Sequence, residues 1–288
     1  MKHNQTLGFT TFSSHERGFT LIELLVVIAV LGILAGGILI ALNIGGTLDK
    51  ANITSAKKFA ASLENGLVIS QVGKWSFEES APPFKDTSGY GNNGSWNGGV
   101  AQESASNCTL GFGACAKFDN QPTTFVDIPY KASLLPPSIT ITAWANTNTL
   151  PSWAGIVTNK VNSTDGINLQ IGSTENIAAL IGDGSTFVYV RTDWVPKTGV
   201  WYHIAITHDA TTNENKLYVN GKLEKTLTNA LVYHSSNPPT RIGIFYIAGN
   251  LPFDGLIDEV AIYNQALTLS KIQKIYAQGV IRRAIAFR

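Results

Sequence analysis

Acidic, histidine and serine side chains after residue 74 are the groups that could carry out acid–base or nucleophilic chemistry. Hydrolysis of a glycoside usually needs two carboxyl groups about 5–10 Å apart, flanking one bond. Asp258 and Glu259 are adjacent on a strand-like run, so strict alternation would place them on opposite faces. His203, His208 and His234 lack metal-ligand spacing, and no serine stands in a nucleophile-elbow motif. The sequence therefore predicts a protein that is not an enzyme.

The glycine-rich loop over residues 86–94 concentrates oxygen donors. The Asp86 carboxylate, the Ser88 hydroxyl and the amides of Asn92 and Asn93 are ligand types that calcium prefers, and calcium takes about six to eight oxygens. One interpretation is a bound calcium ion. The alternative is an ordinary turn, closed by hydrogen bonds between side chains and backbone.

Two tryptophans are candidates for binding a ligand through their rings. Trp153 and Trp194 fall in loop-like segments beside prolines, whereas Trp75, Trp144 and Trp201 fall inside strand-like runs and are expected in the core. Isolated exposed aromatic side chains are common, so a surface position without a ligand is the alternative for both candidates.

The two cysteines, Cys108 and Cys115, lie close together in a turn-rich stretch. An exported domain is expected to join them in a local disulfide that braces the loop, whereas free thiols would suit a cytosolic protein. Neither a Cys-X-X-Cys motif nor a nearby histidine pair is present, so the cysteines give no sign of a metal site.

The apolar run from Leu24 to Leu42 contains no charge and no proline. Its nineteen residues, at about 1.5 Å each in a helix, span close to the ~30 Å hydrocarbon layer, which predicts a transmembrane helix. Basic residues before it, Lys2 and Arg17, favour a cytoplasmic amino terminus. A secretory signal peptide is the alternative, but it would be shorter and would end in a small-residue cleavage site. Glu23 needs a partner, because a carboxylate inside a membrane helix costs about 2.5–3.5 kcal/mol or more.

The run Arg-Gly-Phe-Thr-Leu-Ile-Glu at residues 17–23 closely resembles the processing and methylation motif of type IV pilins and the related pseudopilins. The resemblance implies that a prepilin peptidase cuts between Gly18 and Phe19, and that Phe19 becomes N-methylated. It also implies that the Glu23 carboxylate offsets the positive terminus of a neighbouring subunit. The alternative is a plain single-span anchor with a stray glutamate.

This resemblance also implies partners and a location. The expected partners are prepilin peptidase, other pilin subunits and the inner-membrane assembly machinery. The protein is expected in the bacterial inner membrane before assembly, and in an extracellular pilus or pseudopilus afterwards. Formal net charge is +1, and loss of a leader containing Lys2, Glu16 and Arg17 leaves the chain near neutrality, so no nucleic-acid partner is expected.

Hydrophobic periodicity predicts an α+β chain with one long helix followed by an antiparallel sandwich. Helical spacing of apolar residues runs from Phe19 to about Val72, with an amphipathic stem over residues 47–72. From Trp75 onward the period becomes two, and a helix returns at Leu269–Ala277. Asn-Gly at residues 220–221 predicts a hairpin. The expected strands include Thr123–Ile128, Ile139–Thr147, Ile167–Ile171, Ile177–Ile181, Phe187–Thr192, Trp201–His208, Lys216–Val219, Arg241–Ile247 and Leu256–Tyr263.

Six segments follow in the order seen in laminin-G-like, concanavalin A-like jelly rolls. These segments are Trp75–Glu78, Asp86–Gly94, Ile141–Trp144, Trp201–Ala205, Leu217–Lys222 and Phe253–Tyr263. Members of the family bind glycans, proteins or no known ligand, so the fold leaves the ligand open. Related jelly rolls carry a structural calcium ion in the region of residues 86–94. The resemblance makes Asp258 the natural donor of the second carboxylate that such a site needs.

The expected domains are a prepilin leader (1–18), a pilin-like helix (19–73, transmembrane over 24–42), a jelly-roll head (74–279) and a basic tail (280–288). The tail is expected to fray or to pack on the head. The favoured function is a pilin-like subunit that polymerises through its N-terminal helix and displays a lectin-like head for adhesion or binding of a glycan or surface protein. The alternatives are a minor pseudopilin with a non-binding head and a membrane-tethered carbohydrate-active enzyme.

Overall fold

The computed structural model describes residues 67–286, apart from 81–82, 100, 104–107, 109–112, 160–163, 173, 175, 229–235 and 246–250. The chain divides into two units, Met1–Lys58 and Phe59–Arg288, and the described residues all lie in the second. The leader, the processing site at Gly18 and Phe19, Glu23 and the expected membrane span lie outside them. Within residues 67–286, no helix is long and apolar enough to cross a membrane.

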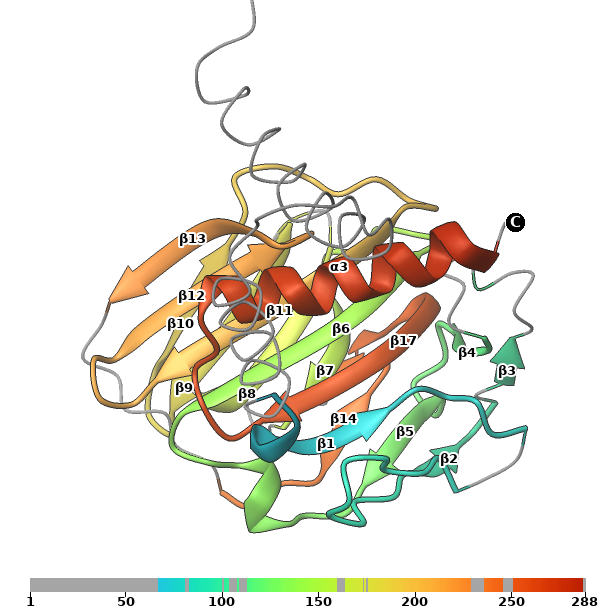
Figure 1. Cartoon of the computed structure of the whole chain (residues 1–288), viewed down its shortest axis with the longest axis horizontal. Coiled ribbons are helices and arrows are strands. Elements are labelled where there is room, and N and C mark those ends of the chain that lie inside the picture. Colours follow the sequence, from blue (N-terminus) through green and yellow to red (C-terminus); the bar gives the residue numbers. More distant parts are fainter. Residues whose placement is uncertain are drawn as a thin grey trace, which may run out of the picture. The chain divides into compact units, whose positions relative to one another are not determined.

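The described residues form an antiparallel β-sandwich with two large sheets (Figure 1). The eight-stranded sheet has the order β13-β12-β11-β6-β17-β4-β3, with β1 also paired to β17. Its strands are β1 (Gln71–Trp75), β3 (Ala101–Glu103), β4 (Cys115–Asp119), β6 (Ile139–Thr147), β11 (Trp201–Asp209), β12 (Glu214–Val219), β13 (Lys222–Thr228) and β17 (Asp254–Tyr263).

The seven-stranded sheet has the order β10-β9-β8-β7-β14-β5-β2. Its strands are β2 (Ser95–Asn97), β5 (Phe125–Ile128), β7 (Ala154–Thr158), β8 (Asp165–Ile171), β9 (Ile177–Asp183), β10 (Phe187–Arg191) and β14 (Thr240–Ile242). A two-stranded pair, β15 (Ile244–Phe245) and β16 (Leu251–Pro252), and the short 3-10 helix η1 (Ala132–Leu134) complete the set before the last helix.

The main core lies between the two large sheets and follows from the period-two pattern of the strands. In β6, Ile139, Ile141 and Ala143 are buried in this core, so the side chains between them point to the other side of the sheet. In β8 of the facing sheet, Ile167 and Leu169 are buried in the same core. Each strand therefore offers one set of side chains to the core and one set to an outward face.

The outward face of the eight-stranded sheet is covered by α3 (Leu269–Ala286), as Figure 1 shows. A second apolar cluster joins Ile272 of α3 to Tyr218, Ala261 and Tyr263 of the sheet and to Leu67, in the helical turn over residues 67–70. The Tyr276 ring of α3 stacks on Trp144, with 5.7 Å between the ring centroids. Burial of this second cluster holds the helix on the sheet.

Two helix boundaries differ from the prediction. The helix expected to reach about Val72 ends earlier, because residues 67–70 are helical and β1 begins at Gln71. Val72 and Trp75 are fully buried in the core, and pairing of β1 with β17 outweighs the helical periodicity of the preceding residues. The helix expected at Leu269–Ala277 runs to Ala286, so residues 280–286 of the expected basic tail continue it.

The strand predictions are correct for the long runs and incomplete for the short ones. Asn220 and Gly221 have φ of 51° and 75°, the left-handed conformation that a tight hairpin requires, and they join β12 to β13 as predicted. The predicted strand Arg241–Ile247 is interrupted at Gly243, where a Cβ would lie 2.1 Å from the Phe118 ring. Strands β1 to β4 and β7 were not among the predicted runs.

Candidate ligand-binding face

The outward side of the seven-stranded sheet carries three buried polar side chains, which we call the polar face: Thr158, Asn168 and Gln170. Because Ile167, Leu169 and Ile171 point into the core, Asn168 and Gln170 point outward, and Thr158 pairs with Asn168 in register. All three residues are fully buried. The Asn168 Nδ2 donates a hydrogen bond of 2.6 Å to Gln170 Oε1.

Three atoms of the polar face lack a hydrogen-bond partner: Thr158 Oγ1, Asn168 Oδ1 and Gln170 Nε2. Buried polar atoms normally have a partner, because an unpaired one costs about 1–3 kcal/mol. These atoms therefore mark positions at which a bound molecule or ordered water would complete the hydrogen bonding. They offer both acceptors and donors without a net charge.

Aromatic and charged side chains border the polar face. On one side, Tyr189 and Arg191 of β10 pair with β9 residues that themselves pair with Asn168 and Gln170. On the other side, Arg241 Nε donates to Asp127 Oδ1 at 2.8 Å. The Arg241 guanidinium also lies 5.2 Å from the centroid of the Phe125 ring. The border thus combines ring faces with charged hydrogen-bonding groups.

Trp153, a predicted ligand-binding residue, lies at this face. It directly precedes β7, whose first residue, Ala154, points into the core, so alternation places Trp153 outward beside the row of Gln170. Its side chain is half-buried, and its indole Nε1 is buried without a hydrogen-bond partner. Trp153 therefore adds an unsatisfied donor to the polar face.

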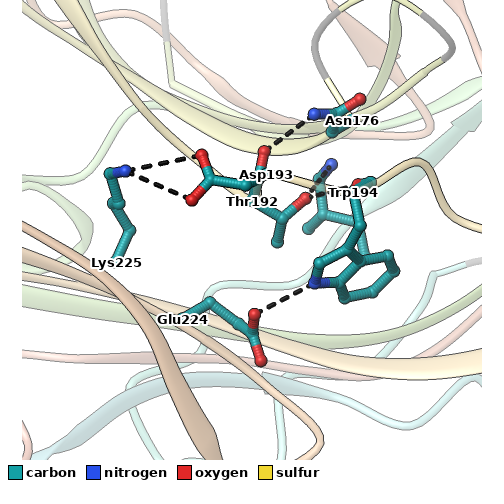
Figure 2. A network of polar contacts seen from close by, with 7 residues as sticks. Asn176, Thr192, Asp193, Trp194, Glu224 and Lys225 are labelled. Carbon is teal, nitrogen blue, oxygen red and sulfur yellow. Dashed lines mark hydrogen bonds and ion pairs between the residues drawn. The ribbon is translucent and has the colours of Figure 1, made fainter.

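Trp194, the second predicted ligand-binding residue, braces an edge of the sandwich (Figure 2). Its Nε1 donates to Glu224 Oε2 of β13 at 3.0 Å, and its carbonyl accepts from Thr192 Oγ1 at 2.8 Å. The Thr192 carbonyl accepts in turn from Asn176 Nδ2 at 2.7 Å. The indole ring lies 5.8 Å from the Tyr202 ring, and 36% of Trp194 is exposed. These contacts fix the loop after β10 against β13.

The two tryptophans are at the same end of the seven-stranded sheet but do not meet. Trp153 precedes β7 and Trp194 follows β10, with β8 and β9 between them. At about 4.8 Å per strand, the strands of the two residues are roughly 14 Å apart. The structure thus places Trp153 on the polar face and leaves Trp194 at its edge. Thr158, Asn168 and Gln170 were not predicted as site residues. The Ile-Asn-Leu-Gln-Ile alternation of residues 167–171 is the sequence signal that could have indicated Asn168 and Gln170.

The loop over residues 86–94 is closed around the Asp86 side chain. Asp86 Oδ1 accepts from the amides of Lys74 and Ser88, each at 2.9 Å, and Oδ2 accepts from the amide of Asn92 at 2.8 Å. The Asn92 Nδ2 donates to the Val72 carbonyl at 2.7 Å, and Asn92 Oδ1 is buried without a partner. This geometry is that of a turn closed by hydrogen bonds, and it accounts for Asp86 without an ion.

Asp258, the predicted second calcium ligand, is fully buried and pairs in register with Trp144. Its Oδ1 accepts from the amide of Glu259 at 2.7 Å, whereas its Oδ2 is buried without a hydrogen-bond partner. Among the described residues there is no group of three or more His, Cys, Asp or Glu side chains that could hold a metal ion. A calcium ion that joins Asp86, Ser88, Asn92 and Asp258 stays a prediction.

A β-bulge changes the expected orientation of the acidic pair. The register of β17 against β6 shifts between Asp258 and Ala261, and Glu259 has φ of 47°. As a result Asp258 and Glu259 both lie on the outward side, between the inward residues Ile257 and Val260. The expectation of opposite faces was wrong for this reason. Asp258 is buried and Glu259 forms an ion pair with Lys74.

The predicted local disulfide between Cys108 and Cys115 is present. Both residues are fully buried and pack with Trp144 and Trp201 on the outward side of the eight-stranded sheet. The disulfide fixes Cys108 to the first residue of β4.

Two sequence families match the chain in separate segments. The profile of the concanavalin A-like lectin/glucanases superfamily matches residues 119–273. The profile of the prokaryotic N-terminal methylation motif matches residues 13–39. No protein of curated function matches the chain.

Solved structures share the sandwich fold at low identity. Domain 4 of AbnA, a GH43 extracellular arabinanase from Geobacillus stearothermophilus solved with arabinotriose, is 23% identical, with a TM-score of 0.60 over 72% of this chain and 98% of that one. The binding domain of Paraclostridial Mosquitocidal Protein 1 is 17% identical, with a TM-score of 0.60 over 74% of this chain and 53% of that one. A botulinum neurotoxin type C structure, described as interacting with two ganglioside molecules, is 14% identical, with a TM-score of 0.60 over 75% and 53%. The chain therefore spans about half the length of these two toxin chains.

Proposed function

Because the chain belongs to the concanavalin A-like lectin/glucanases superfamily and carries a prokaryotic N-terminal methylation motif, we propose that it is a pilin-like filament subunit with a glycan-binding head. In this proposal prepilin peptidase removes residues 1–18, and Phe19 becomes the methylated first residue. The subunit then polymerises through its N-terminal helix, with Glu23 paired to the terminus of a neighbour.

The observation that carries the binding role is the set of unsatisfied atoms on the polar face. Asn168 Oδ1, Gln170 Nε2 and Thr158 Oγ1 are buried without partners. A head that served only for packing would gain stability from apolar side chains at these positions, because no desolvated polar atom would then lack a hydrogen bond. Retained polar side chains on a sheet face favour a ligand that supplies the missing hydrogen bonds.

A neutral glycan fits the chemistry of the polar face. Amide and hydroxyl groups of Thr158, Asn168 and Gln170 match sugar hydroxyls, which both donate and accept. The Trp153 ring beside them offers an apolar surface. Domain 4 of the arabinanase was solved with arabinotriose, so arabinotriose is the first probe for this chain.

Binding of the full chain to a glycan array that includes arabinotriose tests the proposal. The protein is kept in a zwitterionic detergent, because detergents with sugar headgroups would compete. Gln170→Met removes the amide and keeps the side-chain length, and we expect about ten-fold weaker binding, as for loss of one hydrogen bond to the glycan. Because Gln170→Met also removes the acceptor of the Asn168 Nδ2 hydrogen bond, its melting temperature should fall, and binding is compared below that temperature. The matched control is Gln121→Met, an exposed glutamine in the turn after β4.

The outcome separates the proposed function from its alternatives. Equal glycan binding by wild type and Gln170→Met would exclude the polar face as the glycan-binding site. A wild-type chain that enters filaments and binds no glycan would favour a minor pseudopilin with a structural head. Release of sugar from a bound glycan would instead favour the membrane-tethered carbohydrate-active enzyme.

A further inference from the structure

A cavity of about 180 Å³ lies on the opposite side of the sandwich from the polar face, between α3, the helical turn over residues 67–70 and the outward face of β1, β6 and β17. Sheet residues Thr142 and Ala261 line it, together with Leu67 of the turn and Ile275 and Gln278 of α3. An engineered cavity of about 150 Å³ in another protein holds benzene, so this volume has room for about one six-membered ring.

The sheet side of the cavity carries an unsatisfied polar group. Thr142 is 1% exposed, and its Oγ1 has no hydrogen-bond partner although the residue lines the cavity. The hydroxyl can both donate and accept, and burial makes its unpaired state costly. A ligand in the cavity would supply that partner.

The charges at the cavity cancel. Lys74 Nζ lies 3.0 Å from Glu259 Oε2, and both side chains line the cavity with 28% and 14% of their areas exposed. The ammonium keeps two further protons to donate, and the carboxylate keeps a second oxygen to accept. Gln71 Nε2 donates to the Tyr263 hydroxyl at 3.2 Å, which adds an amide and a phenol to the lining. Such a lining favours a neutral molecule with several hydroxyl groups over an anion or a cation.

We propose that this cavity is a binding site for a single neutral monosaccharide, separate from the polar face. The Thr142 hydroxyl hydrogen-bonds one sugar hydroxyl, and the Lys74–Glu259 pair binds others. Leu67, Ala261 and Ile275 contact the apolar side of the ring. The site depends on α3 lying on the sheet, since Gln278 and Ile275 belong to that helix.

Titration of the full chain with glucose, galactose, mannose and N-acetylglucosamine tests the site. Binding is followed by saturation-transfer NMR, with the protein in a zwitterionic detergent. At least one of these sugars is expected to bind the wild type. Thr142→Val is expected to lower the affinity for that sugar about ten-fold, because it removes one hydrogen bond. Thr142→Val keeps the shape of the side chain and removes a buried hydroxyl without a partner, so the melting temperature should not fall. Gln278→Ala, on the exposed surface of α3, is a second variant that should weaken binding without affecting the core.

Gln170→Met distinguishes this site from the polar face. Sugar binding that is unchanged in Gln170→Met and about ten-fold weaker in Thr142→Val supports the cavity. Binding that is weakened only in Gln170→Met would assign the sugar to the polar face and overturn this inference. The absence of binding by all four sugars would also overturn it. Failure here leaves glycan binding at the polar face unaffected, because the two sites share no residue.

Discussion

His203 and Asp258 flank Trp144 on the outward side of the eight-stranded sheet. Each pairs with Trp144 in register, His203 from β11 and Asp258 from β17. The His203 ring lies 5.3 Å from the Trp144 ring and 6.0 Å from the Tyr276 ring of α3, and neither of its nitrogens has a hydrogen-bond partner. Burial lowers the pKa of His203 to about 3. Burial, with the charge of Glu259 next, raises the pKa of Asp258 well above its usual value.

These two pKa shifts act on stability in opposite directions. Between pH 6.5 and about 3 the unfolded chain protonates His203 and the folded chain does not, so the His203 contribution to stability falls as the pH falls. The slope is at most about 1.4 kcal/mol per pH unit. The Asp258 contribution is fully present below pH ~3.9 and is lost as the pH rises through its raised pKa.

Replacement of each group should therefore change the pH dependence with opposite sign. For His203→Phe, the free energy of unfolding relative to wild type should rise as the pH is lowered from 6.5 to 4. For Asp258→Asn, it should rise as the pH is raised from 4 to 7. Urea denaturation at four pH values in this range measures both. Curves that run parallel to wild type would show that neither group titrates differently in the folded and unfolded chains.

At the scale of elements, bulges and topology decide what the sequence pattern leaves open. The long strands and the β12–β13 hairpin were predictable, since alternation and Asn-Gly are local signals. Strict alternation from Ala154 would place Thr158 in the core. A bulge between Gly155 and Val157 instead puts Ile156 and Val157 both inward and turns Thr158 toward Asn168. The polar face could thus be found only in part from the sequence.

The loop over residues 86–94 is an element that fixes β1. Asp86 accepts hydrogen bonds from the Lys74 amide of β1 and from two amides of its own loop, so Asp86→Ala leaves three donors without their charged acceptor. We expect a loss of about 2–4 kcal/mol in the free energy of unfolding. Ser88→Ala is the matched control, because its hydroxyl accepts one 3.3 Å bond from an exposed amide and should cost under about 1 kcal/mol.

Wild type and Asp86→Ala together test the predicted calcium ion. A calcium ion bound only to the folded state would raise the melting temperature of the wild type in calcium relative to chelator, and the rise would be absent in Asp86→Ala. Equal melting temperatures of the wild type in calcium and in chelator would show that the loop over residues 86–94 is a hydrogen-bonded turn without a calcium ion.

At the scale of the whole molecule, the methylation motif and the cavity under α3 were predictable from the sequence to different degrees. The methylation motif was evident because its residues are contiguous, and the sequence profile at residues 13–39 confirms it. The cavity under α3 was not, because its lining comes from residues 67–74, 142–144, 259–263 and 275–279, which only the tertiary fold brings together. Local motifs can thus be predicted from the sequence. Sites formed by residues of several strands cannot, because their composition depends on strand register.

Assembly through the N-terminal helix gives the prediction for the complete protein. Mature protein recovered from the cell surface should begin at Phe19 with a methylated amino group, which intact-mass measurement and terminal sequencing check. Glu23→Ala should leave processing and membrane insertion intact, because it removes a charge from an apolar segment. It should reduce filament incorporation strongly, since loss of one partner of a buried charge pair costs about 3–5 kcal/mol. Glu23→Asp, which keeps the charge, is the matched control and should retain more incorporation than Glu23→Ala. A terminus after Leu42, or normal incorporation of Glu23→Ala, would contradict the pilin-like role.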